Sequence, residues 1–194
     1  MKLLLKQLIS IICLVAIFPF IILFYCFKGV ANADSLIASF SQFLSLVPGK
    51  LGSYLRANFY RVTLNHCSPF AFIGFGTIFS HQDTKIEEGV YIGPQGNIGK
   101  CQIEKDCLLG SGVHILSGKS QHNISDLDIP IREQGGVFQR IVIGENSWIG
   151  NGAIVMANVG KQCIVAAGAV VVNDVPDYAI VAGNPAKIIK MRND

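Results

Sequence analysis

Aliphatic residues recur at every sixth position over much of the chain between Ile73 and Val172, and one long polar segment interrupts the rhythm. A helix has a period of 3.6 residues and a strand with one buried face has a period of two, so neither produces this spacing. A triangular parallel β-helix produces it, because each short face is one repeat and three repeats make a coil. The repeat falls on Ile86, Ile92, Ile98, Ile103, Leu109, Ile115, Ile143, Ile149, Val155, Val159, Val165 and Val171.

Small residues occupy a second recurring position, four residues after many of the aliphatic ones, and Gly often follows the aliphatic residue directly. In a narrow coil both positions point inward, and stacked coils bury a continuous aliphatic column. Two shortened spacings, Ile98 to Ile103 and Val155 to Val159, indicate tightened corners. The alternative is an ordinary β-sandwich with Gly-rich turns. The small positions are Thr77, Val90, Cys107, Val113, Ser147, Ala153, Cys163 and Ala169.

The N-terminal segment has a different composition, because the stretch from Leu3 to Phe27 is almost wholly apolar and long enough to span a bilayer. We interpret residues 1–33 as a retained membrane anchor, either a transmembrane helix or a re-entrant hairpin bent at Pro19. A signal peptide cleaved near Ala31-Asn32-Ala33 is the alternative. Lysines lie on both sides of the segment, so the positive-inside rule does not settle its orientation.

Residues 34–66 form the predicted helical linker. An amphipathic helix is expected from Ser35 to Val47, and it should end at Pro48-Gly49. Its apolar face suits either the membrane interface, which the neighbouring anchor favours, or the β-helix. A second short helix, from Leu51 to about Leu64, carries basic residues that suit anionic lipid head groups or a solvated face equally well. These residues are Lys50, Arg56 and Arg61.

Charge and cysteine content exclude several classes of function. The net charge of the 194 residues is only +3, and no basic block contains interleaved aromatic residues, so we expect no nucleic-acid partner. The six cysteines show neither a CxxC pair nor a Cys/His metal spacing, so we expect no metal site and no disulfide framework. Buried thiols in a reducing compartment fit this pattern best.

The polar segment 116–140 is the predicted place for chemistry. It interrupts a β-helix that we assign to residues 67–194, including a C-terminal tail. Solenoids accept insertions at their corners, and such loops commonly line the binding face. This loop contains His122, flanked by Gln121 and Asn123, and an acidic group formed by Asp126, Asp128 and Glu133.

Three stretches in the last third of the chain resemble the signature of the hexapeptide-repeat acyltransferases. They are Ile143-Gly-Glu-Asn-Ser-Trp-Ile-Gly, Val165-Ala-Ala-Gly-Ala-Val-Val and Val181-Ala-Gly-Asn-Pro-Ala-Lys. The chain resembles galactoside, maltose and envelope-polysaccharide O-acetyltransferases, over about residues 73–191. The resemblance implies a left-handed β-helix, a homotrimer with active sites between subunits, and acetyl-CoA as co-substrate without a metal.

The resemblance also implies roles for individual residues. A loop histidine acts as general base on the acceptor hydroxyl, and His122 is our candidate, ahead of His114 and then His81 or His66. One of the loop carboxylates, Asp126, Asp128 or Glu133, would hold the second ring nitrogen of the base. The residues that correspond to contacts with CoA are Asn151, Ala167, Lys187 and Lys190.

The function implied is acetyl-CoA-dependent O-acetylation of a sugar hydroxyl. The apolar segment suggests a membrane-attached acceptor, such as a cell-envelope polysaccharide or a lipid-linked glycan, and the cytosolic donor suggests a cytoplasmic catalytic domain. An N-acyltransferase acting on an amino-sugar is the close alternative. A non-catalytic β-helix scaffold is another, since fold alone does not prove function. A metal-dependent enzyme such as a carbonic anhydrase would need histidines at ligand spacing.

Overall fold

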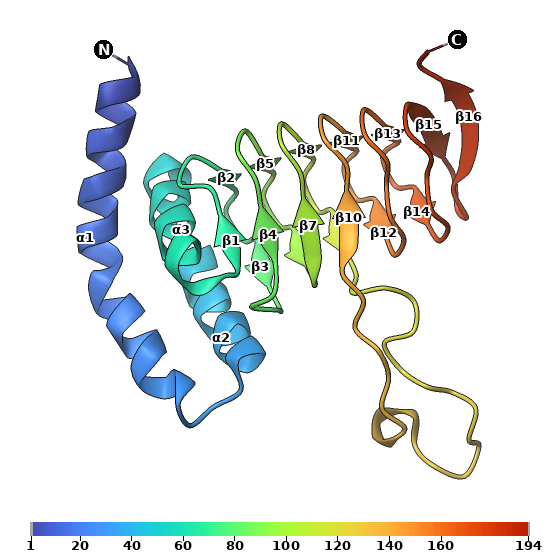
Figure 1. Ribbon diagram of the computed structural model, residues 1–194, viewed down its shortest axis with the longest axis horizontal. Helices are drawn as coiled ribbons and strands as arrows, with labels where there is room; N and C mark the ends of the chain where they lie inside the picture. Colours follow the sequence, from blue (N-terminus) through green and yellow to red (C-terminus); the bar gives the residue numbers. More distant parts are fainter. Residues whose placement is uncertain (1, 194) are drawn as a thin grey trace.

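The six-residue repeat folds into a parallel β-helix with three faces, which we call A, B and C. The computed structural model describes residues 2–193 and places three helices at the N-terminal end of the β-helix (Figure 1). Strands follow one another around the coil in the order A, B, C, and each pairs in parallel with the equivalent strand of the next coil. Face A contains β1 (His66–Cys67), β4 (Lys85–Ile86), β7 (Cys101–Ile103) and β10 (Ile141–Ile143).

The other two faces continue to the C-terminal end of the coil. Face B contains β2 (Phe72–Ile73), β5 (Tyr91–Ile92), β8 (Leu108–Leu109), β11 (Trp148–Ile149), β13 (Ile164–Val165), β15 (Ala179–Ala182) and β16 (Lys187–Met191). Face C contains β3 (Ile78–Phe79), β6 (Asn97–Ile98), β9 (His114–Ile115), β12 (Ile154–Val155) and β14 (Val170–Val171). The last strand, β16, folds back and pairs antiparallel with β15, so it covers the end of face B.

The aliphatic positions of the repeat form the core, as predicted. On face B, for example, Ile92 pairs with Leu109, which in turn lies beside Ile149. All the aliphatic positions and all the small positions of the repeat are buried. The inward column is therefore continuous from coil to coil, and it excludes the β-sandwich alternative.

The recurrent glycines have a steric cause at the corners. A Cβ added at Gly74, Gly144 or Gly150 would lie 2.5 Å from a backbone atom of the next coil. The two shortened spacings are tight corners, as predicted: only two residues separate β6 from β7, and Val159 joins face A through isolated bridges instead of a full strand.

The first helices pack on the β-helix. Helix α2 (Ala33–Ser45) begins at Asn32, whose side-chain oxygen accepts from the backbone N–H groups of Asp34 and Ser35. The hydroxyl of Ser41 accepts a hydrogen bond of 2.7 Å from the N–H of Phe79 on face C. The apolar side of α2 therefore covers the first coil, and our preference for the membrane interface was wrong for this helix.

Helix α1 (Lys2–Lys28) lies outside α2 and α3 (Gly49–Thr63) (Figure 1). It is one continuous helix through Pro19, which excludes the alternative of a re-entrant hairpin bent at this residue. The hydroxyl of Ser10 donates to the Oδ1 of Asn58 at 3.1 Å, and the hydroxyl of Tyr25 donates to the Val62 carbonyl at 2.7 Å. By length and composition α1 can cross a membrane, yet one of its sides packs against the other helices. The buried residues of this side are Ser10, Cys13, Ile17, Ile21 and Phe24.

The cysteines are free thiols, as expected. Five of the six are buried, and Cys26 on α1 is exposed. Burial raises the pKa of the Cys67 and Cys101 thiols to about 12, so these groups are protonated and unreactive at neutral pH.

Arg56 joins the helices to the first coil. Its guanidinium is buried and donates from Nε and Nη2 to the Ile73 carbonyl, at 3.1 and 2.9 Å. Its Nη1 donates to the carbonyls of Leu44 and Val47, at 3.0 and 2.7 Å, near the C-terminal end of α2. We expected Arg56 to meet either lipid head groups or solvent, and both expectations were wrong because carbonyl groups brought together by the fold surround its guanidinium.

Replacing Arg56 tests this junction. We expect Arg56→Met to lower the free energy of unfolding by about 2–4 kcal/mol, because the carbonyls of Ile73, Leu44 and Val47 each lose a charged donor. Arg61→Met, an exposed change on the same helix, should cost less than about 0.5 kcal/mol. Urea unfolding of the full chain in detergent, followed by circular dichroism, measures both. Equal midpoints for the two variants would contradict the role of Arg56.

Candidate active site

The inserted loop leaves face C after β9 and returns to face A at β10, so it projects from the C–A corner (Figure 1). Two backbone hydrogen bonds tie its two ends together. Gln139 N–H donates to the Ser117 carbonyl at 2.8 Å, and Val137 N–H donates to the Ser120 carbonyl at 2.7 Å. The base of the loop is thus fixed to the rigid coil, and the tip extends into solvent.

The expected carboxylates stabilise the loop itself. Oδ1 of Asp126 accepts from the N–H groups of Asp128 and Ile129, at 2.9 and 3.2 Å. Glu133 closes a short 3₁₀ turn (Ile131–Glu133), and its carboxylate pairs with Arg132 at 3.3 Å. Neither contact involves His122, so the orienting role of Asp126 or Glu133 stays a prediction.

His122 is exposed on the loop and borders an open hollow. Among residues 2–193, no hydrogen bond of its imidazole to another side chain or to the backbone is present in this chain. A second hollow, which Arg140, Asn158 and Asp174 help to line, shares Lys119 and Met156 with the first. The imidazole therefore stands at one end of a partly polar surface along the C–A corner. The residues lining the His122 hollow include Leu116, Gly118, Gln121, Ile124 and Ile131.

The other histidines lie in different environments. His114 is exposed on face C, and His66 lies 3.5 Å from a carboxylate oxygen of Glu87. His81 lies at the C–A corner beneath the loop, where its Nδ1 is 2.9 Å from the Ser80 hydroxyl and its ring packs on Phe138 at 5.1 Å between centroids. Burial lowers the pKa of His81.

An ionic cluster supports the loop beside His81, and sequence reasoning did not find it. Asp83 pairs with Arg140 at the end of the loop, with Lys100 at 3.4 Å, and with the Asn65 amide at 2.8 Å. Burial opposes ionisation of Asp83, but the Asn65 and Arg140 contacts outweigh it and hold the pKa of its carboxyl below the ordinary value. These residues are far apart in sequence, and only the coil register brings them together.

The expected CoA contacts lie at another corner. Asn151 and Ala167 are exposed at the B–C corner of neighbouring coils, where the Asn151 carbonyl accepts from Gly168 N–H at 2.8 Å. Lys187 and Lys190 are exposed on β16, beyond the last coil. Face C separates the B–C corner from the C–A corner that carries His122. One chain therefore does not place the predicted base and the predicted CoA residues in one hollow.

No protein-family model matches the chain, but curated proteins and solved structures do. The chain is 30% identical over 163 residues to a chloramphenicol acetyltransferase from Agrobacterium fabrum, covering 73% of this chain and 78% of that protein. It is 31% identical over 127 residues to WbbJ of Escherichia coli K12, which is named as an O-acetyl transferase of lipopolysaccharide biosynthesis; 62% of this chain and 63% of WbbJ align. The chain spans only 24% and 34% of the first two curated relatives that it matches.

Two solved structures share the fold. A maltose O-acetyltransferase from Clostridium difficile superposes with a TM-score of 0.69 and 18% identity, over 83% of this chain and 89% of that one. A hexapeptide-repeat acetyltransferase from Vibrio cholerae, solved with acetyl coenzyme A, gives a TM-score of 0.58 and 20% identity, over 86% and 92%. These likenesses confirm the left-handed parallel β-helix. The fold is that of the β-helical acyltransferases, and the aligned relatives are acetyltransferases. The chain belongs to the hexapeptide-repeat acyltransferase family.

The base of the loop should respond to pH through His81. Asp34 and Asp83 favour its protonated form, but burial and Lys100 oppose protonation more strongly. Because the pKa of His81 is lowered in the closed state, proton uptake favours the opened state. The equilibrium constant for opening the base of the loop should therefore rise as pH falls below about 6.5, by at most about tenfold at pH 5.5.

Hydrogen exchange of residues 136–141, corrected for the intrinsic effect of pH, measures this opening in wild type and in His81→Gln. We expect the variant to lose the dependence between pH 7.5 and 5.5. If His81→Gln kept the pH dependence of exchange, a titratable group other than His81 would be responsible for it.

Proposed function

We propose that this protein is an acetyl-CoA-dependent O-acetyltransferase that modifies a sugar hydroxyl of a cell-envelope polysaccharide or lipid-linked glycan. The observation that carries the proposal is the exposed His122 on a loop anchored to an acyltransferase β-helix. The relationship to WbbJ, whose name refers to lipopolysaccharide, supports a glycan acceptor. The apolar helix α1 supports attachment to the membrane, with the β-helix on the cytoplasmic side where the donor is available.

The proposed transfer needs a general base for the acceptor hydroxyl and no covalent acyl-enzyme intermediate. A sugar hydroxyl is a weak nucleophile at neutral pH, and an imidazole titrates in the range where it can accept the hydroxyl proton during attack. In the proposed reaction His122 removes this proton as the hydroxyl oxygen bonds to the thioester carbonyl carbon. The C–S bond then breaks, the acetyl ester forms, and the CoA sulfur receives the proton from the imidazolium.

The residues predicted to bind CoA fit its chemistry. The ammonium groups of Lys187 and Lys190 are exposed and suit phosphate oxygens. The close approach of backbones at Gly150 and Ala167 leaves a corner without bulky side chains. Since this corner and the His122 loop lie on opposite edges of face C, we propose a homotrimer in which neighbouring subunits supply the two halves of each site.

Removal of the proposed base is the first test. His122→Ala should lower turnover of acetyl-CoA by about two to four orders of magnitude, while acetyl-CoA binding is retained, because only proton transfer is lost. His114→Ala, an exposed change on the same coil, should stay near wild type. Release of free thiol by the full chain in detergent is measured with glycan alcohols and amino-sugars as separate acceptors. A near-normal His122→Ala variant would assign the base elsewhere, and turnover only with amino-sugars would favour N-acylation.

The shared site is tested by mixing two inactive variants. His122→Ala lacks the base, and Asn151→Trp blocks the expected CoA corner. If each site takes one half from each of two subunits, trimers reassembled from equal amounts should recover about a quarter of wild-type activity. Separately assembled variants that are mixed without exchange serve as the control. Lack of recovery in exchanged trimers would place both halves in one chain.

A further inference from the structure

The helical cap, formed by α1, α2 and α3, exposes a broad apolar surface on the side away from the β-helix. The outward side of α1 is covered with aliphatic and aromatic side chains, which soluble monomers rarely expose as one large patch. Exposed Phe43, Leu46 and Leu51 extend the apolar character of the cap to α2, α3 and their connection. The exposed residues of α1 are Leu4, Leu5, Leu8, Ile11, Ile12, Val15, Phe18, Ile22, Leu23 and Phe27.

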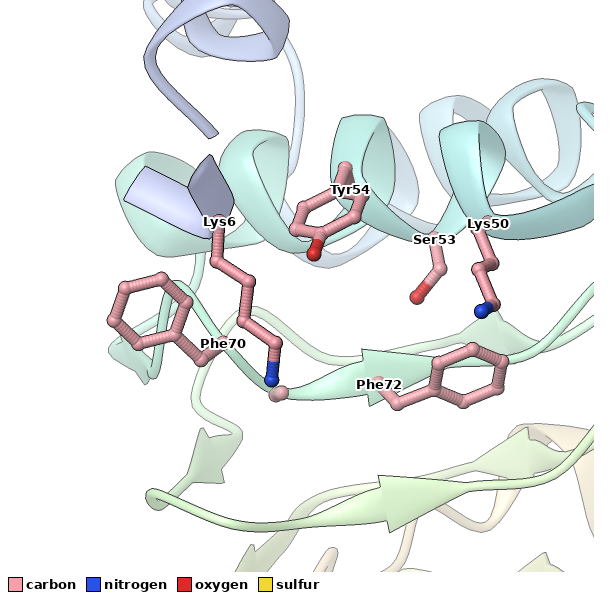
Figure 2. A pocket seen from close by; sticks show the side chains of 7 residues that line it. Lys6, Lys50, Ser53, Tyr54, Phe70 and Phe72 are labelled. Carbon is pink, nitrogen blue, oxygen red and sulfur yellow. The ribbon is translucent and has the colours of Figure 1, made fainter. Parts of the chain in front are cut away.

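A pocket opens at the edge of this cap, between α1, α3 and the first coil (Figure 2). Lys6 reaches into it from α1 and Lys50 from the first turn of α3, and the hydroxyl of Tyr54 points toward the same space (Figure 2). Phe70 and Phe72 form the opposite wall. Across residues 4–193, neither lysine forms an ion pair within this chain. Two cations that form no ion pair therefore border one small pocket, and Glu88 and Asp106 lie with Lys6 at the neighbouring hollow.

An apolar groove adjoins the pocket and shares Lys6, Lys50 and Tyr54 with it. Leu5, Ile9 and Leu51 line the rest of the groove. Cationic groups beside an apolar groove match an amphiphile with an anionic head and a hydrocarbon tail. The positive end of the α3 dipole lies at the same place, because Lys50 is in the first turn of this helix, and Pro48 provides no side-chain cap there.

The packing of α1 defines its orientation relative to this ligand. A single crossing helix without partners is surrounded by lipid, but α1 is joined to α3 by Ser10 near one end and by Tyr25 near the other. Helix α3 is in turn held to the first coil by Arg56. With this packing kept, the outward side of α1 meets the bilayer when the helix lies along the membrane surface.

We propose that α1 lies in the plane of the membrane interface and that the Lys6–Lys50 pocket binds the phosphate of an anionic membrane lipid, whose acyl chains follow the adjoining groove. The inference rests on the membrane attachment that is part of the proposed function, but not on the transferase chemistry. The helical cap is then a lipid-recognition surface, and the pocket gives the protein a preference for anionic bilayers.

Vesicle binding by the full chain, transferred from detergent by dilution, tests the pocket. The vesicles contain phosphatidylcholine alone or with about one quarter phosphatidylglycerol, and the variant is Lys6→Gln/Lys50→Gln. We expect it to bind anionic vesicles more than about a hundredfold more weakly, since each lysine loses a charge-assisted contact with the bound phosphate. Binding to neutral vesicles should not change. The matched control, Lys28→Gln/Arg61→Gln, removes two exposed cations from the same helices outside the pocket and should lose at most about thirtyfold, because each contributes only diffuse attraction of about a factor of five.

The outcomes separate the alternatives. Equal losses in both double variants would replace the pocket by diffuse attraction and overturn the site. Displacement of the protein from anionic vesicles by millimolar inorganic phosphate, at constant ionic strength, would show that the pocket takes free phosphate and would overturn the lipid assignment. Activity of the Lys6→Gln/Lys50→Gln variant on a water-soluble acceptor should be unchanged, so failure of the lipid site is distinguishable from failure of the transferase proposal.

The orientation of α1 is tested by labelling. Single cysteines replace Gln7 or Lys28, near the two ends of α1, in a Cys26→Ser chain whose other cysteines are buried. An impermeant maleimide applied to reconstituted vesicles should label both positions from the same side, and labelling from opposite sides would show a transmembrane helix.

Discussion

Stacking of buried aliphatic side chains from one coil to the next is the interaction on which the rest of this structure depends. Each coil contributes short strands that are stable only through the strands above and below them. The close approach at Gly74, Gly144 and Gly150 keeps the corners in register, because a side chain there would collide with the next backbone. This register also aligns Asp83 with Arg140 and Asn151 with Gly168, which belong to different coils.

No coil precedes the first one, and the helices cover its open end instead. Ser41 supplies a hydrogen-bond acceptor to the exposed edge of β3, and Arg56 supplies donors to the carbonyl at the end of β2. Polar groups of the helices thus replace the backbone partners that a further coil would provide. The cap consequently belongs to the folded unit, and the apolar side of α1 is carried by a rigid support.

Much of the fold follows from local pattern, but parts of the site do not. Residues such as Ile92, Leu109 and Ile149 show the period of six because each must point inward. The sequence alone therefore identifies the β-helix. The surroundings of Arg56 and Asp126 are not predictable in this way. The sequence does not show that carbonyl groups of distant segments surround the arginine on its helix. A loop aspartate can accept hydrogen bonds from nearby backbone N–H groups as readily as it can bind a histidine ring, and the sequence does not decide between the two.

The arrangement along the coil axis connects the cap with the proposed chemistry. The His122 loop returns at β10, three strand spacings from β1 on face A. Neighbouring strands lie about 4.8 Å apart, so the base of the loop is roughly 14 Å from the first coil. The helical cap adds two layers of helix, each about 10 Å thick, so an interfacial α1 would hold the base of the loop at a fixed height of roughly 30 Å above the head groups. A glycan whose lipid end stays in the bilayer would have to extend over this height to reach His122, which suits a long polysaccharide chain. A transmembrane α1 separated from the cap would not fix this height.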